Sequence, residues 1–246
     1  MTAAAAQALF IGWDVGGWNC EQNRASRDAL VVLDDQRKVL GKPWRGNLRR
    51  LINQSGDTEG FIGRLLGLCE LDAQAYAAAP VVLAIDTPLG FSTDFIELLV
   101  HGRAVESIEG SSSNPYLFRR TERFLFDKGL SPLSPVKDMI GSQATKGMHV
   151  LARFAPHIER CGVWSDLQRL RAIEAYPSAC KRSAQMAALR RGCLRGVELE
   201  HADQQDALTC ALIAWLFHFQ PEHLAQPISD IPLREGWIFF PADVLA

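Results

Sequence analysis

The sequence lacks the features that mark membrane and exported proteins. A membrane span needs roughly 18 apolar residues, and the longest apolar run, from Ala207 to Phe217, is shorter and includes Thr209. The first residues, MTAAAAQALFIGWD, contain no basic segment, and their apolar run meets Asp14 at once. A signal peptide begins with a basic segment, so we expect no signal peptide, no membrane partner and a cytoplasmic location.

Motifs of several common site types are also missing. The six cysteines form no CxxC pair and have no regular spacing, so we expect reduced thiols and neither a disulfide framework nor a zinc site. The GxxxxGK[ST] loop of P-loop proteins and the HExxH motif of metalloproteases do not occur. No internal repeat is visible.

The charge balance leaves no large excess of either sign. The chain carries 26 Lys and Arg against 28 Asp and Glu, for a net charge of -2. This excludes a protein that coats nucleic acid through bulk positive charge, although a local basic groove stays open. With 48% hydrophobic and 22% charged residues over 246 positions, we expect one folded domain spanning 1–246.

Short apolar runs predict a buried sheet with helical connections, which is an α/β architecture. Three strand-like runs end in an acid: LFIGWD at 9–14, VVLAID at 81–86 and LRAIE at 170–174. The runs at 28–35 and 38–44 are expected to form a hairpin, and helical spacing covers 58–71, 93–100, 178–191 and 203–219. The segment 101–168 has no clear strand and is interpreted as an inserted lid, helical around 117–128 and 146–160.

Acidic side chains follow three of the predicted strands. Asp14, Asp86 and Glu174 each close an apolar run, and ligands of open α/β sheets bind beyond the carboxyl ends of parallel strands. Asp203 and Asp206 are three residues apart, which places them on one face at the start of the last predicted helix. Up to five carboxylates are therefore expected to converge at one edge of the sheet.

Carboxylates in close proximity repel one another unless cations neutralise them. Hard oxygen ligands suit Mg²⁺ or Mn²⁺, and two such ions can act together on a phosphoryl group. Each acid also has a structural interpretation: Asp203 as a helix N-cap, Asp14 or Asp86 as the start of a turn, and Glu174 as support behind the ligands.

The ordered segments IGWDVGGW, AIDTPLGF, AYPSACK, DQQDALTCALIAW and EGWIFFP resemble the domain-of-unknown-function 429 family, a group of predicted nucleases with a ribonuclease H-like fold. The resemblance covers residues from about 8 to 241. The segment ADQQDAL at 202–208 also resembles the last catalytic helix of RuvC-type Holliday-junction resolvases.

The resemblance implies a mixed five-stranded sheet in the order 3-2-1-4-5, with flanking helices and an inserted cap. It implies that Asp14 bridges two metal ions, that Asp86 and Asp206 are further ligands, and that Asp203 assists as a catalytic residue. RuvC-type enzymes have Glu where this chain has Asp86, and Glu174 has no counterpart in that resolvase set.

Basic residues near the acids are candidate phosphate contacts. The segment 169–195 contains seven Lys and Arg residues against one acid, and 118–123 combines Phe with three Arg. From these segments we name Arg119, Arg120, Lys181 and Arg182 as substrate-binding candidates. A solvated helix face explains the first segment equally well. His201, two residues before Asp203, is interpreted either as a general acid or base or as a helix cap.

Together these features predict a Mg²⁺- or Mn²⁺-dependent nuclease that hydrolyses nucleic-acid phosphodiesters with two metal ions. Two alternatives stay open. An actin-like or sugar-kinase-like phosphotransferase would share the Asp-Val-Gly-Gly turn at 14–17, but such folds need a second lobe and a second glycine-rich turn. A non-catalytic interaction module of the same fold is the other.

Overall fold

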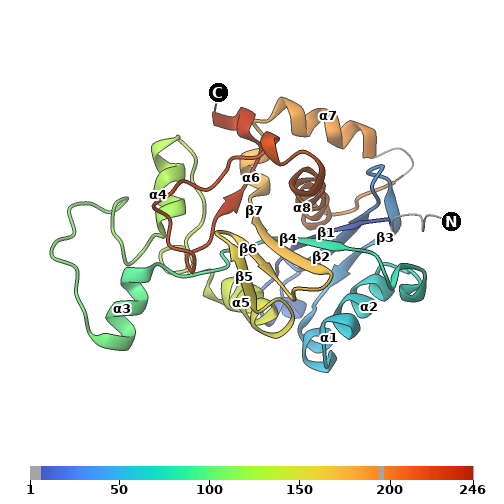
Figure 1. Ribbon diagram of the computed structural model, residues 1–246, viewed down its shortest axis with the longest axis horizontal. Helices are drawn as coiled ribbons and strands as arrows, with labels where there is room; N and C mark the ends of the chain where they lie inside the picture. Colours follow the sequence, from blue (N-terminus) through green and yellow to red (C-terminus); the bar gives the residue numbers. More distant parts are fainter. Residues whose placement is uncertain (1–6, 194–196, 246) are drawn as a thin grey trace.

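The structure, a computed structural model, describes residues 7–193 and 197–245 (Figure 1). An open mixed sheet forms the centre, with the strand order β3-β2-β1-β4-β7-β6-β5 and with β8 paired to β7. The strands are β1 Leu9–Asp14, β2 Asp28–Leu33, β3 Val39–Gly46, β4 Val81–Asp86, β5 His157–Arg160, β6 Val163–Ser165, β7 Leu170–Ala175 and β8 Ile238–Phe239.

The five strands expected from the apolar runs correspond to β1, β2, β3, β4 and β7. They occur in the predicted order, with β1, β4 and β7 parallel and with β1, β2 and β3 antiparallel. The prediction of five strands is wrong, because β5 and β6 extend one edge and β8 pairs with β7, which gives eight strands in the described residues. The chain is therefore a mixed α/β protein.

Helices cover both faces of the sheet, and each face has its own apolar core. On one face lies the long helix α8, Ala202–Phe219, which is buried along most of its length (upper side of Figure 1). On the other face lie α1 Arg49–Gln54, α2 Thr58–Leu68 and α5 Gly141–Phe154. Because β1 and β4 are buried between these layers, they are apolar at every position up to the terminal Asp.

Side-chain capping explains where α2 begins and where the helix predicted over 178–191 is interrupted. Asp57 accepts a hydrogen bond from the Gly60 amide at 2.7 Å, so α2 starts at the next residue, as the sequence predicts. The helix predicted over 178–191 is instead two helices, α6 Pro177–Cys180 and α7 Ala184–Cys193. The break comes at Ser183, whose hydroxyl accepts the Met186 amide hydrogen bond and starts α7.

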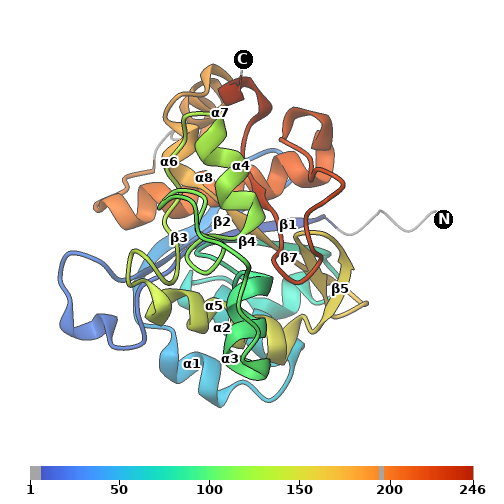
Figure 2. The same ribbon diagram turned by 90° about the vertical axis from the view of Figure 1, so that its left-hand side faces the viewer.

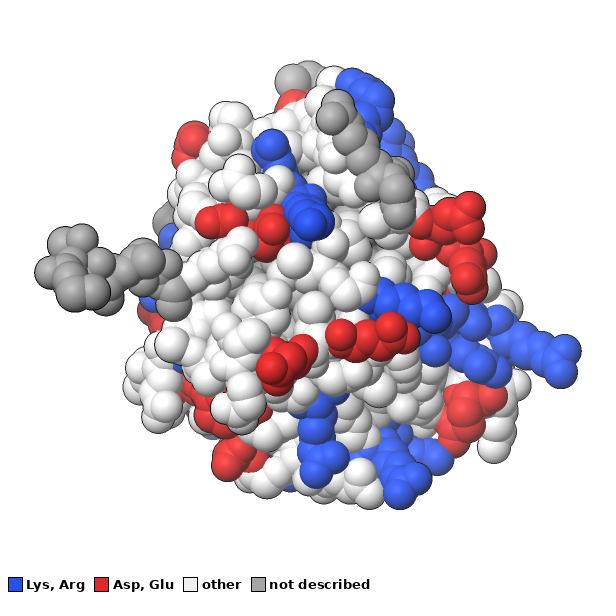
Figure 3. All heavy atoms as spheres, turned by 90° about the vertical axis from the view of Figure 1, so that its right-hand side faces the viewer, with Lys and Arg blue, Asp and Glu red and all other residues white. Residues whose placement is uncertain are grey.

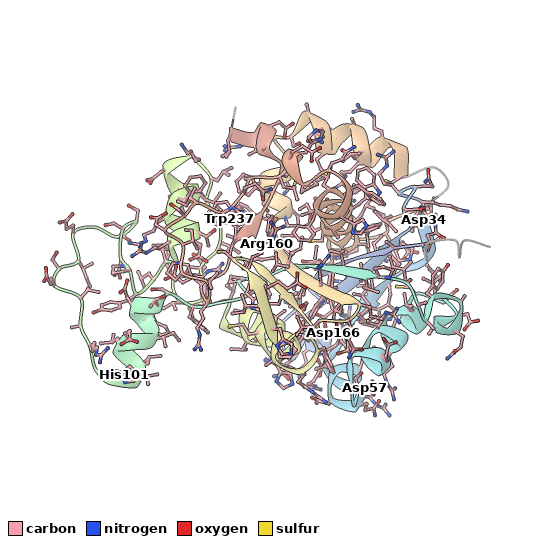
Figure 4. All side chains as sticks on the ribbon, in the orientation of Figure 1. Asp34, Asp57, His101, Arg160, Asp166 and Trp237 are labelled. Carbon is pink, nitrogen blue, oxygen red and sulfur yellow. The ribbon has the colours of Figure 1, made fainter. Side chains whose placement is uncertain are left out.

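The predicted lid at 101–168 contains strands, so its description as strand-free is wrong. It holds α4 Arg120–Asp127 and then α5, which begins earlier and ends earlier than the predicted 146–160. Its last part forms β5 and β6, which join the sheet through β7. Figure 2 shows α4 together with α3, Thr93–His101, in front of the sheet, and Figure 4 shows His101 at the outer end of α3.

The C-terminal segment ties α4 to the sheet. Trp237, labelled in Figure 4, is fully buried and packs on Phe124 of α4 with ring centroids 5.4 Å apart. Its indole donates a hydrogen bond to the Ala225 carbonyl. The following residues form β8, which pairs in parallel with β7. Residues 238–239 of the C-terminal segment are thus part of the sheet.

Short 3-10 turns lie at Cys20–Gln22, Ala73–Tyr76, Pro221–His223 and Ala242–Leu245. All six cysteines are free, as the spacing predicts. Within the described ranges, every helix is too short or too polar to cross a membrane. On the face shown in Figure 3, acidic and basic side chains are interspersed.

Candidate functional site

Asp14 and Asp86 are neighbours at the carboxyl ends of adjacent parallel strands. They are paired in register across β1 and β4, and adjacent strands lie about 4.8 Å apart. Both belong to the strand face that carries Phe10 and Val82, which is the face covered by α8. Both also line one pocket. The sequence prediction that these two acids come together is confirmed.

The close approach of α8 to β1 brings a third acid near this pair. At Gly12, two residues before Asp14, an added Cβ would lie 1.9 Å from the Ala207 carbonyl oxygen, so the helix backbone rests directly on the strand. Asp206 precedes Ala207 and therefore lies close to the strand ends. It lines a separate pocket, however, together with Lys181 and Arg190. The short helix α6 contributes residues to both pockets.

Burial and mutual repulsion shift the pKa values of these acids upward. Burial, followed by the charges of Asp86, Asp203, Asp206 and Asp28, raises the pKa of Asp14 well above its usual range. Burial and the charges of Asp206 and Glu174 raise the pKa of Asp86 from 3.8 to about 8. Burial also raises the pKa of Asp206, although Lys181 and Arg190 oppose the rise. Each carboxylate therefore destabilises the others when ionised.

The Asp14, Asp86 and Asp206 carboxylates share a further property. In the described part of the chain, no hydrogen-bond donor or cationic side chain pairs with any of them. Among the same residues, no group of three or more His, Cys, Asp or Glu side chains is arranged to hold a metal ion. The predicted three-aspartate ligand set is thus not assembled, whereas the Asp14–Asp86 pair is.

Asp203 differs from these acids because it has partners. Its carboxylate accepts hydrogen bonds from the Arg45 side chain at 2.7 Å and from the Arg27 amide at 2.9 Å. His201 is the N-cap of α8, and its Nδ1 accepts the Asp203 amide hydrogen bond. The pair Asp203–Arg45 fastens the start of α8 to β3, and His201 fills the capping role that the sequence also suggested for Asp203.

Glu174 lies on the other strand face because of the register of β7. It is level with Ile85, one residue before Asp86, so its side chain leaves the opposite face of the sheet. It is 2% exposed and forms a two-fold ion pair with Arg119, with N to O distances of 2.6 and 2.8 Å. It also accepts the Leu89 amide hydrogen bond. The structure places Glu174 in support of the site, as the sequence allowed.

The four predicted phosphate contacts differ in whether their side chains are buried in ion pairs or exposed. Arg119 is 1% exposed and donates to Glu122, Glu174 and the Glu235 carbonyl, so its guanidinium is not offered to a substrate. Its role is to neutralise buried acids, which corrects the predicted contact. Arg120 is half exposed, reaches the Asp230 carbonyl and lines a separate cavity of about 760 Å³.

Of the other two, Lys181 lies beside Asp206. Lys181 lines the pocket of Asp206 with Arg190 and Arg191, so part of the predicted basic segment does face an acid of the site. Arg182 donates to the Gly129 carbonyl at 3.2 Å. Arg195, which belongs to the same predicted segment, falls outside the described residues.

Sequence reasoning missed a buried ion pair behind the acids. Asp28 and Lys146 are fully buried and paired, and Lys146 also donates to the Gly16 carbonyl at 3.2 Å. Asp28 accepts hydrogen bonds from the Gly16 amide and the Trp13 indole. These bonds hold the turn that follows Asp14. No sequence pattern distinguishes Lys146 from a surface lysine.

The Asp14–Asp86 pocket has a volume of about 400 Å³. Its walls come from the ends of β1, β4 and β7, from β8, from α6 and from the segment 131–143. Its lining consists of Asp14, Val15, Asp86, Thr87, Pro88, Ser131, Pro132, Leu133, Ile140, Gln143, Glu174, Ala175, Tyr176, Ser178 and Ile238. Three acids therefore line the pocket, of which Glu174 is paired with Arg119, together with apolar walls and a few neutral polar groups.

Comparison with known proteins adds no assignment. No protein-family model matches the chain, and neither a curated protein nor a solved structure shows significant similarity to it. The chemistry of the site therefore follows from its own residues.

The raised pKa of Asp86 predicts how stability changes with pH. Because the folded-state pKa of about 8 exceeds the ordinary 3.8, the ionised form destabilises the fold, so stability rises as pH falls from above 8 towards 4. Asp86→Asn removes the destabilising charge of the ionised Asp86 carboxylate. The variant is therefore expected to melt at a higher temperature than wild type at pH 9, by about 2–4 °C for each kcal/mol of repulsion removed.

Melting curves of wild type and Asp86→Asn between pH 5 and pH 9 check this expectation. The control is Glu70→Gln, which neutralises an acid whose side chain is 70% exposed and should follow the wild type. A melting-temperature difference between Asp86→Asn and wild type that is the same at every pH contradicts the assigned shift.

Proposed function

We propose that the protein is a divalent-cation-dependent phosphodiesterase that acts on nucleic acid and has a ribonuclease H-like fold. The observation that supports the reaction is the Asp14–Asp86 pair: two adjacent carboxylates with raised pKa values and no protein partner within the described residues. Such a pair is costly unless a cation binds there.

The residues at the site fit a hard divalent cation. Mg²⁺ commonly uses one or two protein carboxylates and completes its shell with water and substrate phosphate oxygens, so Asp14 and Asp86 suffice as protein ligands. A bound cation would supply Lewis-acid neutralisation of the phosphate charge. Asp206 adds negative charge from the neighbouring pocket, and a second cation there is part of the proposal.

The residues of the chain have separate roles in this reaction. Lys181, Arg190 and Arg191, in the pocket beside Asp206, provide positive charge for substrate phosphates. Water adds across one P–O bond of the diester, which leaves a phosphate monoester on one fragment and a hydroxyl group on the other. The Asp203–Arg45 and Glu174–Arg119 pairs keep α8 and β7 in place around the reacting groups.

Asp14→Asn is expected to reduce cation-dependent cleavage by about 100-fold or more, since loss of a partner behind a metal ligand alone costs 10–100-fold. The assay measures cleavage of single-stranded, double-stranded and branched DNA and RNA with Mg²⁺ or Mn²⁺. Glu70→Gln is the matched control and retains activity. Full cation-dependent cleavage by Asp14→Asn excludes the proposal.

Thermal melting separates the enzyme from an interaction module that has merely kept the fold. Cation binding to the folded state stabilises it by about 2.7 kcal/mol at a concentration 100 times the Kd. Mn²⁺ is therefore expected to raise the melting temperature of the wild type but not of Asp14→Asn. No shift in the wild type at millimolar Mn²⁺ favours the module, and ATP binding in calorimetry favours a phosphotransferase.

A further inference from the structure

The size of the acidic pocket limits what reaches Asp14 and Asp86. Small-ligand sites span about 300–1,000 Å³, and this pocket, at about 400 Å³, lies near the lower bound. That volume suits one nucleotide unit. Two paired bases with their backbones are far larger, so a double helix does not fit inside this pocket while it stays paired.

One wall of the pocket is built from the segment 131–143. Pro132, Leu133 and Ile140 from this wall line the pocket together with Tyr176 and Ile238 from the sheet side. Apolar and aromatic side chains in the lining of a pocket of this volume are suited to contact with the face of a planar base. Asp14 and Asp86 line the pocket at the ends of β1 and β4, and the phosphate of a bound nucleotide would lie beside them.

This wall is anchored at several points, so the pocket is a fixed feature of the fold. Ser134 is fully buried, and its hydroxyl bonds to the Leu117 carbonyl. Asp138 accepts the Ser134 amide hydrogen bond at 2.8 Å. Beyond the wall, the buried Lys146–Asp28 pair holds α5 to the start of β2. These bonds oppose the opening that a duplex would require.

Neutral polar groups line the same space. Thr87, which follows Asp86, is 5% exposed, and its hydroxyl has no hydrogen-bond partner among the described residues. Buried hydroxyls usually have a partner, and a polar atom of a bound ligand can supply one. Gln143, Ser131 and Ser178 add donors and acceptors to the lining.

We infer that this pocket takes a single unpaired nucleotide, either at a strand end or as a nucleoside phosphate ester, and that it rejects paired nucleic acid. The inference deepens the proposed function and rests on it for the chemistry. Its own basis is the volume of the pocket, its fixed wall at 131–143 and the mixture of apolar faces with a few polar groups.

The first test compares substrates of one sequence with Mg²⁺ or Mn²⁺: a single strand, the blunt duplex, and the nitrophenyl ester of thymidine monophosphate. Because unpairing costs a few kcal/mol, the blunt duplex is expected to be cleaved about tenfold or more slowly than the single strand.

Hydrolysis of the nitrophenyl ester shows that a lone nucleoside ester suffices, whereas cleavage of the single strand alone assigns the pocket to strand ends. Equal rates on duplex and single strand overturn the inference and leave the proposed function standing.

The second test measures binding and does not depend on cleavage. Fluorescence anisotropy follows a labelled single strand and its duplex on Asp14→Asn, which removes one negative charge from the pocket. Ser131→Trp, added to that variant, fills the pocket from an exposed position and is expected to weaken single-strand binding about tenfold. Ser107→Trp, on an exposed loop outside every pocket described here, is the matched control.

The two tests separate the possible failures. Preferential single-strand binding that Ser131→Trp abolishes, without cleavage of any substrate, rejects the proposed function and supports the pocket assignment. Equal binding of single strand and duplex, or binding that Ser131→Trp does not change, rejects the pocket assignment whatever the cleavage result.

Discussion

Arg119→Ala lowers the free energy of unfolding by about 3–5 kcal/mol, the usual cost of removing one partner from a buried ion pair. Arg119 is the cation for two buried acids: Glu122 at 2.9 Å and Glu174 at 2.6 Å. It also donates to the Glu235 carbonyl. Without Arg119, two carboxylates stay buried with no opposing charge, and α4 loses its link to β7.

Denaturant unfolding of Arg119→Ala beside wild type measures this loss. Arg103→Ala is the matched control, because the Arg103 side chain is 73% exposed in its pair with Glu97 and should change stability by no more than about 0.5 kcal/mol. The double variant Arg119→Met, Glu174→Gln is expected to recover part of the lost free energy of unfolding, because it removes one of the two buried carboxylates that have no opposing charge. A loss below about 1 kcal/mol for Arg119→Ala shows that the network is not a main support of the fold.

Buried charges such as Arg119 mark the limit of prediction from this sequence. The run Phe-Arg-Arg-Thr-Glu-Arg at 118–123 reads as an exposed basic segment, and Arg is seldom buried. Glu122 belongs to this run, but only the tertiary structure brings in Glu174, the second glutamate that makes burial tolerable. Lys146 is a second example, since its partner Asp28 lies 118 residues away in the chain.

The sheet was far more predictable, because its central strands are buried on both faces. Apolar runs predicted β1, β2, β4 and β7, and the acid that closes the run is the last residue of β1 and of β4. By contrast, β5 reads His-Ile-Glu-Arg and is exposed at every position. An edge strand of this kind has no hydrophobic pattern and forms only because β6 offers it a hydrogen-bonding edge.

Register explains why one strand-end acid behaves differently from the other two. Asp14, Asp86 and Glu174 look equivalent in the sequence, since each follows an apolar run. Asp14 is level with Asp86, but Glu174 is level with Ile85. A shift of one residue moves a side chain to the other face of the sheet, so Glu174 faces Arg119. Sequence alone does not specify this shift.

The site therefore divides into acids that have partners and acids that have none. Asp203, Glu174 and Asp28 each have a basic partner, and each holds a neighbouring element in place. Asp14, Asp86 and Asp206 have none among the residues described, and burial raises the pKa of each. Unpaired buried carboxylates lower the stability of a fold, and strong contacts elsewhere can offset that loss. A bound cation would neutralise these carboxylates, which is the physical reason to look for one at this site.

Gly12→Ala is expected to destabilise the protein by more than the about 1–3 kcal/mol typical of overpacking. The new Cβ would lie 1.9 Å from the Ala207 carbonyl oxygen and 2.4 Å from the Ala211 amide nitrogen, and both are backbone atoms of α8. Neither atom can yield by a side-chain rotation, so the whole helix has to move away from β1. That movement carries Asp206 away from Asp14 and is expected to reduce any cation-dependent stabilisation as well.

Gly67→Ala is the matched control for this prediction. Gly67 lies within α2, and an added Cβ there meets nothing within 4 Å. Alanine is favoured over glycine in helices by about 0.5–1 kcal/mol, so this variant is expected to be slightly more stable than wild type. Denaturant unfolding and Mn²⁺-dependent melting of both variants check the pair. A Gly12→Ala protein as stable as wild type means that α8 does not rest on β1 at this glycine and that this crossing does not bring Asp206 to the strand ends.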